Sequence, residues 1–288
     1  MFGLHTVRPQ NPQARARRLV WSIIRYLLIA LILFFFLFPI FWILSTSFKT
    51  PEEFQHNPPI YLPSQPHLNS YVRGLTVNDG GRALRDSLIV STGATLLTLA
   101  LGASTAYSMA RFQTGGRHFS FWVLSQRMMP PVAAVLPIFI LYRSFKLTDT
   151  YIGLILLYTV FNLPLCIWML RSYFIEVPVE IEESALIDGA SRWQVLRYIT
   201  LPLAAPGLSA TMVFIFIFSW TEFFFALVLT TNNVLTLPLL VSRFFGTQSY
   251  DWGVASAISV VATIPVIVLG FLVREHFVRG ITMGAIRE

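Results

Sequence analysis

Long runs with at most one charged residue constrain this chain more than any other feature. A helix needs about 20 mainly apolar residues to cross the hydrocarbon core of a membrane. Six runs meet that length, and they cover residues 26–48, 87–110, 118–142, 150–170, 204–229 and 252–273. Because the mean hydropathy is +0.64 and only 12% of residues are charged, the sequence predicts an all-α integral membrane protein with six transmembrane helices.

The segments outside these runs predict how the chain is oriented. Residues 1–25 read as a disordered basic tail, residues 49–86 as an ordered external loop rich in proline, and residues 171–203 as a polar loop between the fourth and fifth helices. If the tail is cytoplasmic, the inner segments hold about twice as many lysines and arginines as the outer ones. We therefore expect both termini and the 171–203 loop in the cytoplasm, and residues 26–288 to form one transmembrane domain.

The polar loop has the local signals of a helical hairpin. Pro178 suits a first helical turn, and Glu180, Glu182 and Glu183 follow it, where the helix dipole favours acids. Gly189 is suited to end that helix in a left-handed conformation.

A second short helix is expected directly after the glycine. Ser191 and Gln194 have the spacing of a capping box, and Leu201-Pro202 is expected to end the helix. Apolar residues recur at helical spacing in this segment, at Trp193, Leu196 and Ile199. We expect these side chains to root the hairpin, that is, to pack against the membrane domain.

The hairpin also carries a known motif. The motif comprises Glu183-Ser184-Ala185, then Gly189 after three intervening residues, then Ile199-Thr200-Leu201-Pro202 after nine more. It resembles the EAA loop of permease subunits in binding-protein-dependent ABC importers, with Ser184 in place of an alanine. In that family the loop is a cytoplasmic coupling helix that docks into the ATPase subunit. The resemblance implies that the coupling residues here are Glu183, Ser184, Ala185, Asp188, Gly189 and Ala190.

Two further segments extend the resemblance to sugar-type permeases. SFKTPEEF and NSYVRGL in the 49–86 loop resemble the first external loop of those proteins, and residues 280–286 resemble their C-terminal signature. The resemblance is therefore to the maltose-transporter class of carbohydrate importers in the bacterial cytoplasmic (inner) membrane. It implies a second homologous permease, two ABC ATPase subunits that bind the ATP, an extracytoplasmic solute-binding protein, membrane lipid and a sugar substrate.

A few polar residues inside the predicted helices are candidates for the translocation path. Arg127 is either a path or gate residue or an arginine that reaches the membrane surface. Glu222, in a stretch that resembles the family's Trp-Asn-Glu segment, is either a path residue that partners Arg127 or a structural hydrogen-bonding group. The full candidate set is Arg127, Gln126, Asn162, Trp220 and Glu222.

The sequence contains none of the common catalytic motifs. It has no Walker A sequence and no HExxH or CxxC spacing, and Cys166 is its single cysteine. We therefore predict no catalytic residues, no metal site, no cofactor and no nucleic-acid partner, and we attribute the net charge of +7 to membrane topology. The alternatives are an ion-coupled secondary transporter, an ABC permease for a non-sugar solute and an intramembrane enzyme. The secondary transporter would need intramembrane carboxylates, and within the predicted helices the sequence offers Glu222 alone.

Overall fold

A computed structural model describes residues 12–244 and 251–284. Within them every regular element is helical, as the sequence predicts. The elements are α1 (Pro12–Ser47), α2 (Pro51–Gln55), α3 (Asn69–Val72), η1 (Arg73–Val77), α4 (Gly80–Arg111), α5 (Gly116–Ser125), η2 (Gln126–Met128), α6 (Pro131–Ser144), α7 (Tyr151–Glu176), α8 (Val179–Ile187), α9 (Arg192–Val195), η3 (Leu196–Thr200), α10 (Leu201–Leu203), α11 (Ala205–Trp220), α12 (Phe224–Leu229), α13 (Leu237–Arg243) and α14 (Trp252–Gly284).

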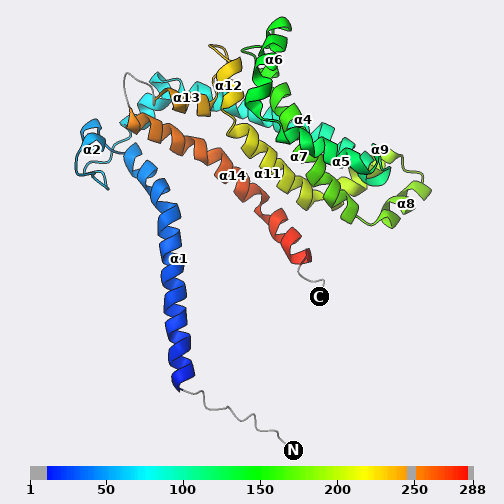
Figure 1. Ribbon diagram of the computed structural model, residues 1–288, viewed down its shortest axis with the longest axis horizontal. Coiled ribbons are helices and arrows are strands. Elements are labelled where there is room, and N and C mark those ends of the chain that lie inside the picture. The colour runs from blue at the N-terminus through cyan, green and yellow to red at the C-terminus, as the bar shows by residue number, and fades with distance from the viewer. Residues whose placement is uncertain (1–11, 245–250, 285–288) are drawn as a thin grey trace, which may run out of the picture.

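The centre of the fold is the pair α4 and α7, with α11 packed against both (Figure 1). The face that α4 buries is rich in small residues such as Ala94, Gly102 and Ala106, which let helix backbones approach closely. A Cβ added at Gly102 would collide with the Cys166 sulfur on α7. The α4–α7 contact is therefore tight along the length of both helices.

Helix α1 lies apart from this bundle. It packs against α14 near the residues that end α1, then runs away from the other helices (Figure 1). In its apolar segment Leu19–Thr46, none of the most apolar 18-residue window is buried within the chain. This surface needs lipid or another apolar partner to cover it.

Among the described residues, four to six helical segments are long and apolar enough to cross a membrane. The four straight candidates are Leu19–Thr46, Gly80–Arg111, Tyr151–Glu176 and Trp252–Arg274. Two bent pairs raise the total to six if each pair counts as one span: His118–Met128 with Pro131–Ser144 at 86°, and Arg192–Leu203 with Ala205–Trp220 at 82°. The first bend breaks the predicted run 118–142 at Met129-Pro130. The second bend lies at Ala204, where the predicted run 204–229 begins, and that run has a separate break at Thr221–Phe223, between α11 and α12.

Helix boundaries differ from the prediction where charged residues lie inside a helix. Helix α4 begins at Gly80, within the expected 49–86 loop, because the buried carboxylate of Asp86 accepts hydrogen bonds from the Tyr151 hydroxyl and the Leu235 backbone N–H. Helix α7 continues past Arg171 to Glu176. A test that counts only uncharged length starts α4 too late and ends α7 too early.

The terminal predictions are also revised. Residues 12–25 are helical rather than disordered, because Pro12 stands at a helix start and alanine, arginine and leucine, all good helix formers, follow it. Residues 1–11 of the predicted tail lie outside the described residues. At the other end α14 continues to Gly284, so the first part of the 280–286 signature is helical and the rest lies outside the description.

Candidate functional site

The hairpin between α7 and α11 folds as its local signals predict. Gly189 has a φ of +90°, and the N–H groups of Gly189 and Ala190 donate to the carbonyls of Leu186 and Ala185 at 3.1 and 3.0 Å. These bonds end α8 in a left-handed turn. The side chain of Ser191 and that of Gln194 then form the expected capping box at the start of α9.

The second helix of the hairpin does not end at Leu201-Pro202. It widens into the π-helical turn η3 over Leu196–Thr200 and continues as α10 to Leu203, before the 82° bend into α11. Proline has no N–H and its ring clashes with the carbonyl four residues earlier in a regular helix. The wider turn before Pro202 lets the chain remain helical at this point.

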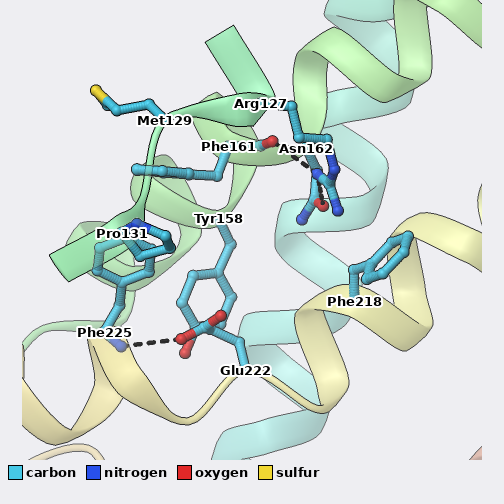
Figure 2. Close-up of a pocket in the computed structure, with 9 residues that line it drawn as sticks. All are labelled: Arg127, Met129, Pro131, Tyr158, Phe161, Asn162, Phe218, Glu222 and Phe225. Atoms are coloured by element: carbon cyan, nitrogen blue, oxygen red, sulfur yellow. Dashed lines mark hydrogen bonds between the residues drawn. The ribbon is translucent and has the colours of Figure 1, made fainter. Parts of the chain in front are cut away.

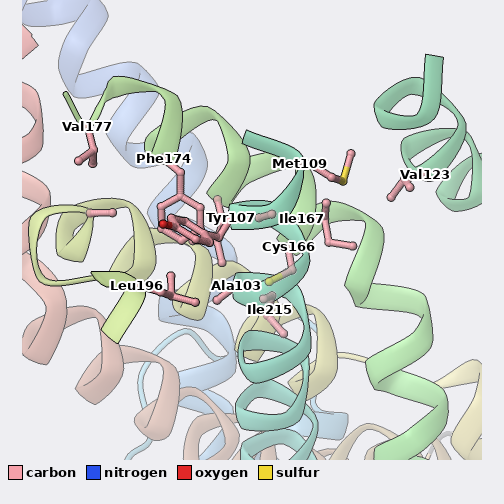
Figure 3. Packing of buried hydrophobic residues seen from close by; sticks show 13 residues of the cluster. Ala103, Tyr107, Met109, Val123, Cys166, Ile167, Phe174, Val177, Leu196 and Ile215 are labelled. Carbon is pink, nitrogen blue, oxygen red and sulfur yellow. The ribbon is translucent and has the colours of Figure 1, made fainter. Parts of the chain in front are cut away.

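The π-turn also changes which residues root the hairpin. Val195, Leu196 and Thr200 are buried, and Leu196 packs in a cluster with Tyr107 and Phe174 (Figure 3). The prediction is confirmed for Leu196 and wrong for Trp193, which is 62% exposed. Val195 and Thr200 are five residues apart, the period of a π-turn, whereas the prediction assumed regular helical spacing.

A buried carboxylate fastens the hairpin to α4. Glu182, in the first turn of α8, is 2% exposed. Its oxygens accept hydrogen bonds from Arg111 Nε at 3.0 Å, Arg111 Nη2 at 2.9 Å, the Tyr107 hydroxyl at 3.0 Å and the Thr200 hydroxyl at 2.8 Å. Arg111 Nη2 also donates to the Val177 carbonyl at 2.9 Å. Glu182 therefore joins the C-terminal part of α4 to both hairpin helices, and Arg111 adds the residue that follows α7.

The electrostatics of Glu182 favour the charged form. Burial opposes ionisation, but the hydrogen bonds from Arg111, Thr200 and Tyr107 outweigh it and hold the pKa of Glu182 below its usual range. The sequence analysis identified Glu182 only as an acid near a helix start, and Arg111 is one of the lysines and arginines counted in the inner segments. They are 71 residues apart, and no local pattern connects them.

The residues named for ATPase coupling share the outer side of the hairpin. Glu183, Ser184, Asp188 and Gly189 are exposed, and Ala185 and Ala190 are half-buried. The carboxylate of Glu183 therefore lies on the accessible side of α8, whereas that of its neighbour Glu182 lies inside.

Arg127 lies at the break between α5 and α6. Its Nη1 donates to the Phe161 carbonyl at 2.9 Å and to Asn162 Oδ1 at 3.2 Å, and its guanidinium stacks over the Phe218 ring at 4.5 Å. These contacts hold the charge against α7 and α11. Asn162 in turn donates to the Ser219 hydroxyl at 3.1 Å.

Glu222 lies at the other break, between α11 and α12. Its Oε1 accepts the Phe225 backbone N–H at 2.9 Å and so caps the start of α12. Arg127, Asn162 and Glu222 line one cavity (Figure 2). No ion pair joins Arg127 to Glu222 among the residues that the structure describes.

The other two path candidates lie elsewhere. Gln126 donates to the Trp122 carbonyl at 3.3 Å and lines a neighbouring, mainly apolar cavity of about 690 Å³. Trp220 is buried, and its indole N–H donates to the Ala262 carbonyl on α14 at 3.0 Å. The structure thus brings three of the five candidates together.

Comparisons with known proteins point to one family. Residues 98–283 match the model of the binding-protein-dependent transport system inner membrane component. The trehalose/maltose transport system permease protein MalG of Thermococcus litoralis is 34% identical over 87% of this chain and 91% of its own length. The trehalose transport system permease protein SugB of Mycobacterium tuberculosis is 34% identical over 94% of this chain and 98% of its own.

A solved structure shares the fold. It is a bacterial ABC transporter involved in the import of the acidic polysaccharide alginate. One of its chains superposes with a TM-score of 0.74 at 22% identity, over 93% of this chain and 99% of the other.

Proposed function

The chain belongs to the family of binding-protein-dependent transport system inner membrane components, and we propose that it is a permease subunit of an ATP-driven importer for a sugar or sugar derivative. Relatives named for trehalose, maltose and diacetylchitobiose transport support the sugar class. The protein is the transport component of such an importer and not its ATPase. The membrane is the bacterial cytoplasmic membrane, with both termini and the hairpin on the cytoplasmic side.

The observation that carries this proposal is the attachment of the hairpin through Glu182. A coupling element has to receive force on one face and pass it to the membrane helices from another. Here α8 exposes Glu183 and Asp188 on its outer side, while Glu182 is bonded to Arg111 and Tyr107 on α4. When two ATPase subunits bind ATP and close, a hairpin docked on one of them would move the α4–α7 pair with it.

The remaining partners follow from the same function. A second, homologous permease chain and lipid would cover the apolar surface of α1, and an extracytoplasmic binding protein would deliver the sugar. The path for that sugar would pass Arg127, Asn162 and Glu222, at the two helix breaks.

Transport by the assembled complex tests the function. Vesicles that contain both permeases, the two ATPases and the binding protein are expected to accumulate sugar only with ATP and the binding protein. Collapsing the proton gradient at constant ATP should leave uptake unchanged. Uptake that needs the gradient and not ATP would establish the secondary-transporter alternative instead.

Reversing the charge of Glu183 tests the docking face. Glu183→Lys is expected to abolish uptake, because the exposed side chain would no longer suit the cleft of the ATPase, while the membrane domain still inserts. Glu176→Lys, an exposed acid at the end of α7, is the matched control and should retain uptake. Co-purification of the ATPase with each variant is the direct measurement; equal amounts of ATPase on Glu183→Lys and wild type would contradict the docking assignment.

A further inference from the structure

The cavity between the two helix breaks has the size of a small ligand fragment. Its volume of about 180 Å³ is what about six water molecules occupy in the liquid. Polar groups enter it from α7 and from the two breaks, beside the rings of Phe161 and Phe225 (Figure 2). A single sugar ring is of the right order for such a space.

Polar groups in this cavity lack partners. Tyr158 is 2% exposed, and its hydroxyl has no hydrogen-bond partner among the residues that the structure describes. Glu222 uses Oε1 to cap α12, and no described residue donates to its Oε2. Buried polar groups in folded proteins are nearly always paired, so the unpaired Tyr158 hydroxyl beside the cavity indicates a ligand or water that pairs it, and the half-buried Glu222 has an oxygen free to accept from the same ligand.

The charges in the cavity distinguish between classes of ligand. Arg127 has only neutral partners in the described part of the chain, namely the Phe161 carbonyl, Asn162 and the Phe218 ring. Glu222 lines the same cavity with the opposite charge. An anionic ligand drawn to Arg127 would meet the carboxylate of Glu222, and a cation would meet the guanidinium.

An uncharged polyol matches both groups. Each sugar hydroxyl can accept a hydrogen bond from Arg127 and donate one to Glu222, and the Tyr158 hydroxyl can do either. The apolar face of a sugar ring suits the Phe161 and Phe225 rings, whose centroids are 4.6 Å apart. We propose that this cavity binds one uncharged sugar ring of the substrate as it crosses the membrane, an inference that rests on the importer function proposed above.

A cysteine reporter tests this directly in the assembled complex without its binding protein. Cys166 is buried and is the single cysteine of the chain, so Cys166→Ala gives a background without cysteine. In that background Met129→Cys places one thiol on the cavity wall. The rate at which a water-soluble thiol reagent labels it measures how accessible the cavity is. The probes are glucose, galactose and N-acetylglucosamine as neutral rings and glucuronate as an acidic ring. Val132→Cys, exposed on α6 and outside the cavity lining, is the matched control.

We expect at least one neutral probe to slow labelling of Met129→Cys and not of Val132→Cys, and glucuronate to protect at least about fivefold less well. Adding Tyr158→Phe, which removes one oxygen, should weaken protection about fivefold, the loss of a typical hydrogen bond. Tyr142→Phe, a buried tyrosine on the neighbouring cavity, should not. If Met129→Cys fails to assemble, Pro131→Cys, at another position on the cavity wall, serves as reporter.

Three results would overturn the inference: no protection by any neutral probe, protection by glucuronate that equals or exceeds theirs, or equal effects of Tyr158→Phe and Tyr142→Phe. The vesicle assay separates this failure from failure of the importer function. ATP-dependent uptake by the wild-type complex together with an unprotected cavity would reject the binding site alone.

Discussion

Glu182→Ala is expected to abolish uptake while leaving the chain inserted in the membrane. The substitution removes every hydrogen bond that the carboxylate accepts and leaves Arg111, whose side chain is 7% exposed, without its ion-pair partner. Breaking a buried ion pair by removing one member costs about 3–5 kcal/mol. That penalty falls on the contact between the hairpin and α4, so the hairpin should detach. Uptake, ATPase activity and thermal unfolding of the complex are the measurements.

Two controls keep this prediction specific. Glu180→Ala removes an exposed acid from the same helix and should behave as wild type. Glu182→Gln and Arg111→Gln are compared with the double variant that carries both changes. The double variant should lose less unfolding free energy than the two single variants lose together, because the two residues interact directly. Additive losses, or uptake by Glu182→Ala at the wild-type rate, would show that the attachment lies elsewhere.

The direction of the Glu182 pKa shift also sets a pH dependence. A carboxylate with a depressed pKa in the folded state contributes stability above its unfolded pKa, which for glutamate is about 4.3, and loses that contribution as the pH falls through the folded pKa. The attachment should therefore stay intact at neutral and mildly acidic pH. It should weaken only in acid below the usual glutamate range.

Gly189→Pro is the second substitution with a large expected effect. Proline fixes φ near −65°, whereas Gly189 has a φ of +90°, and it removes the N–H that donates to the Leu186 carbonyl. The turn between α8 and α9 would have to open, and the docking face would lose its shape. We expect no uptake and no ATPase co-purification, with normal membrane insertion.

Milder substitutions at Gly189 separate backbone conformation from crowding. A Cβ at this position meets no atom within 4 Å, so its cost comes from φ alone. Gly189→Ala should lose about 1–2 kcal/mol, and Gly189→Asn less, because asparagine tolerates the left-handed region. An uptake order of glycine, asparagine, alanine, proline is expected; equal activity of all four would mean that the turn conformation does not matter.

The hairpin was predictable because its determinants are local. A glycine suited to the left-handed region and a serine three residues before a glutamine fix the turn and the start of α9 within a few residues of sequence. The helical membrane architecture was predictable for a similar reason, since apolar length alone implies it.

Contacts between distant residues were not predictable. Arg111 and Glu182, and Arg127 and Asn162, meet because α4, α5 and α7 pack together, and nothing near each residue in sequence identifies its partner. The breaks at Met129-Pro130 and Thr221–Phe223 were hidden for another reason. Hydropathy does not distinguish a straight helix from a bent one, and Pro39 and Pro164 lie inside continuous helices.

The close packing of α4 on α7 at Gly102 has a mechanical consequence. The hairpin follows α7 directly in the chain, and the hydrogen bonds of Glu182 attach it to α4. It is therefore attached to two helices that are too closely packed to slide past each other. Displacing the hairpin would therefore turn the pair as one rigid body. The flexible joints would be the helix breaks at Met129-Pro130 and Thr221–Phe223, and both of them border the cavity that Arg127 and Glu222 line. Motion at one end of the protein would change the shape of that cavity.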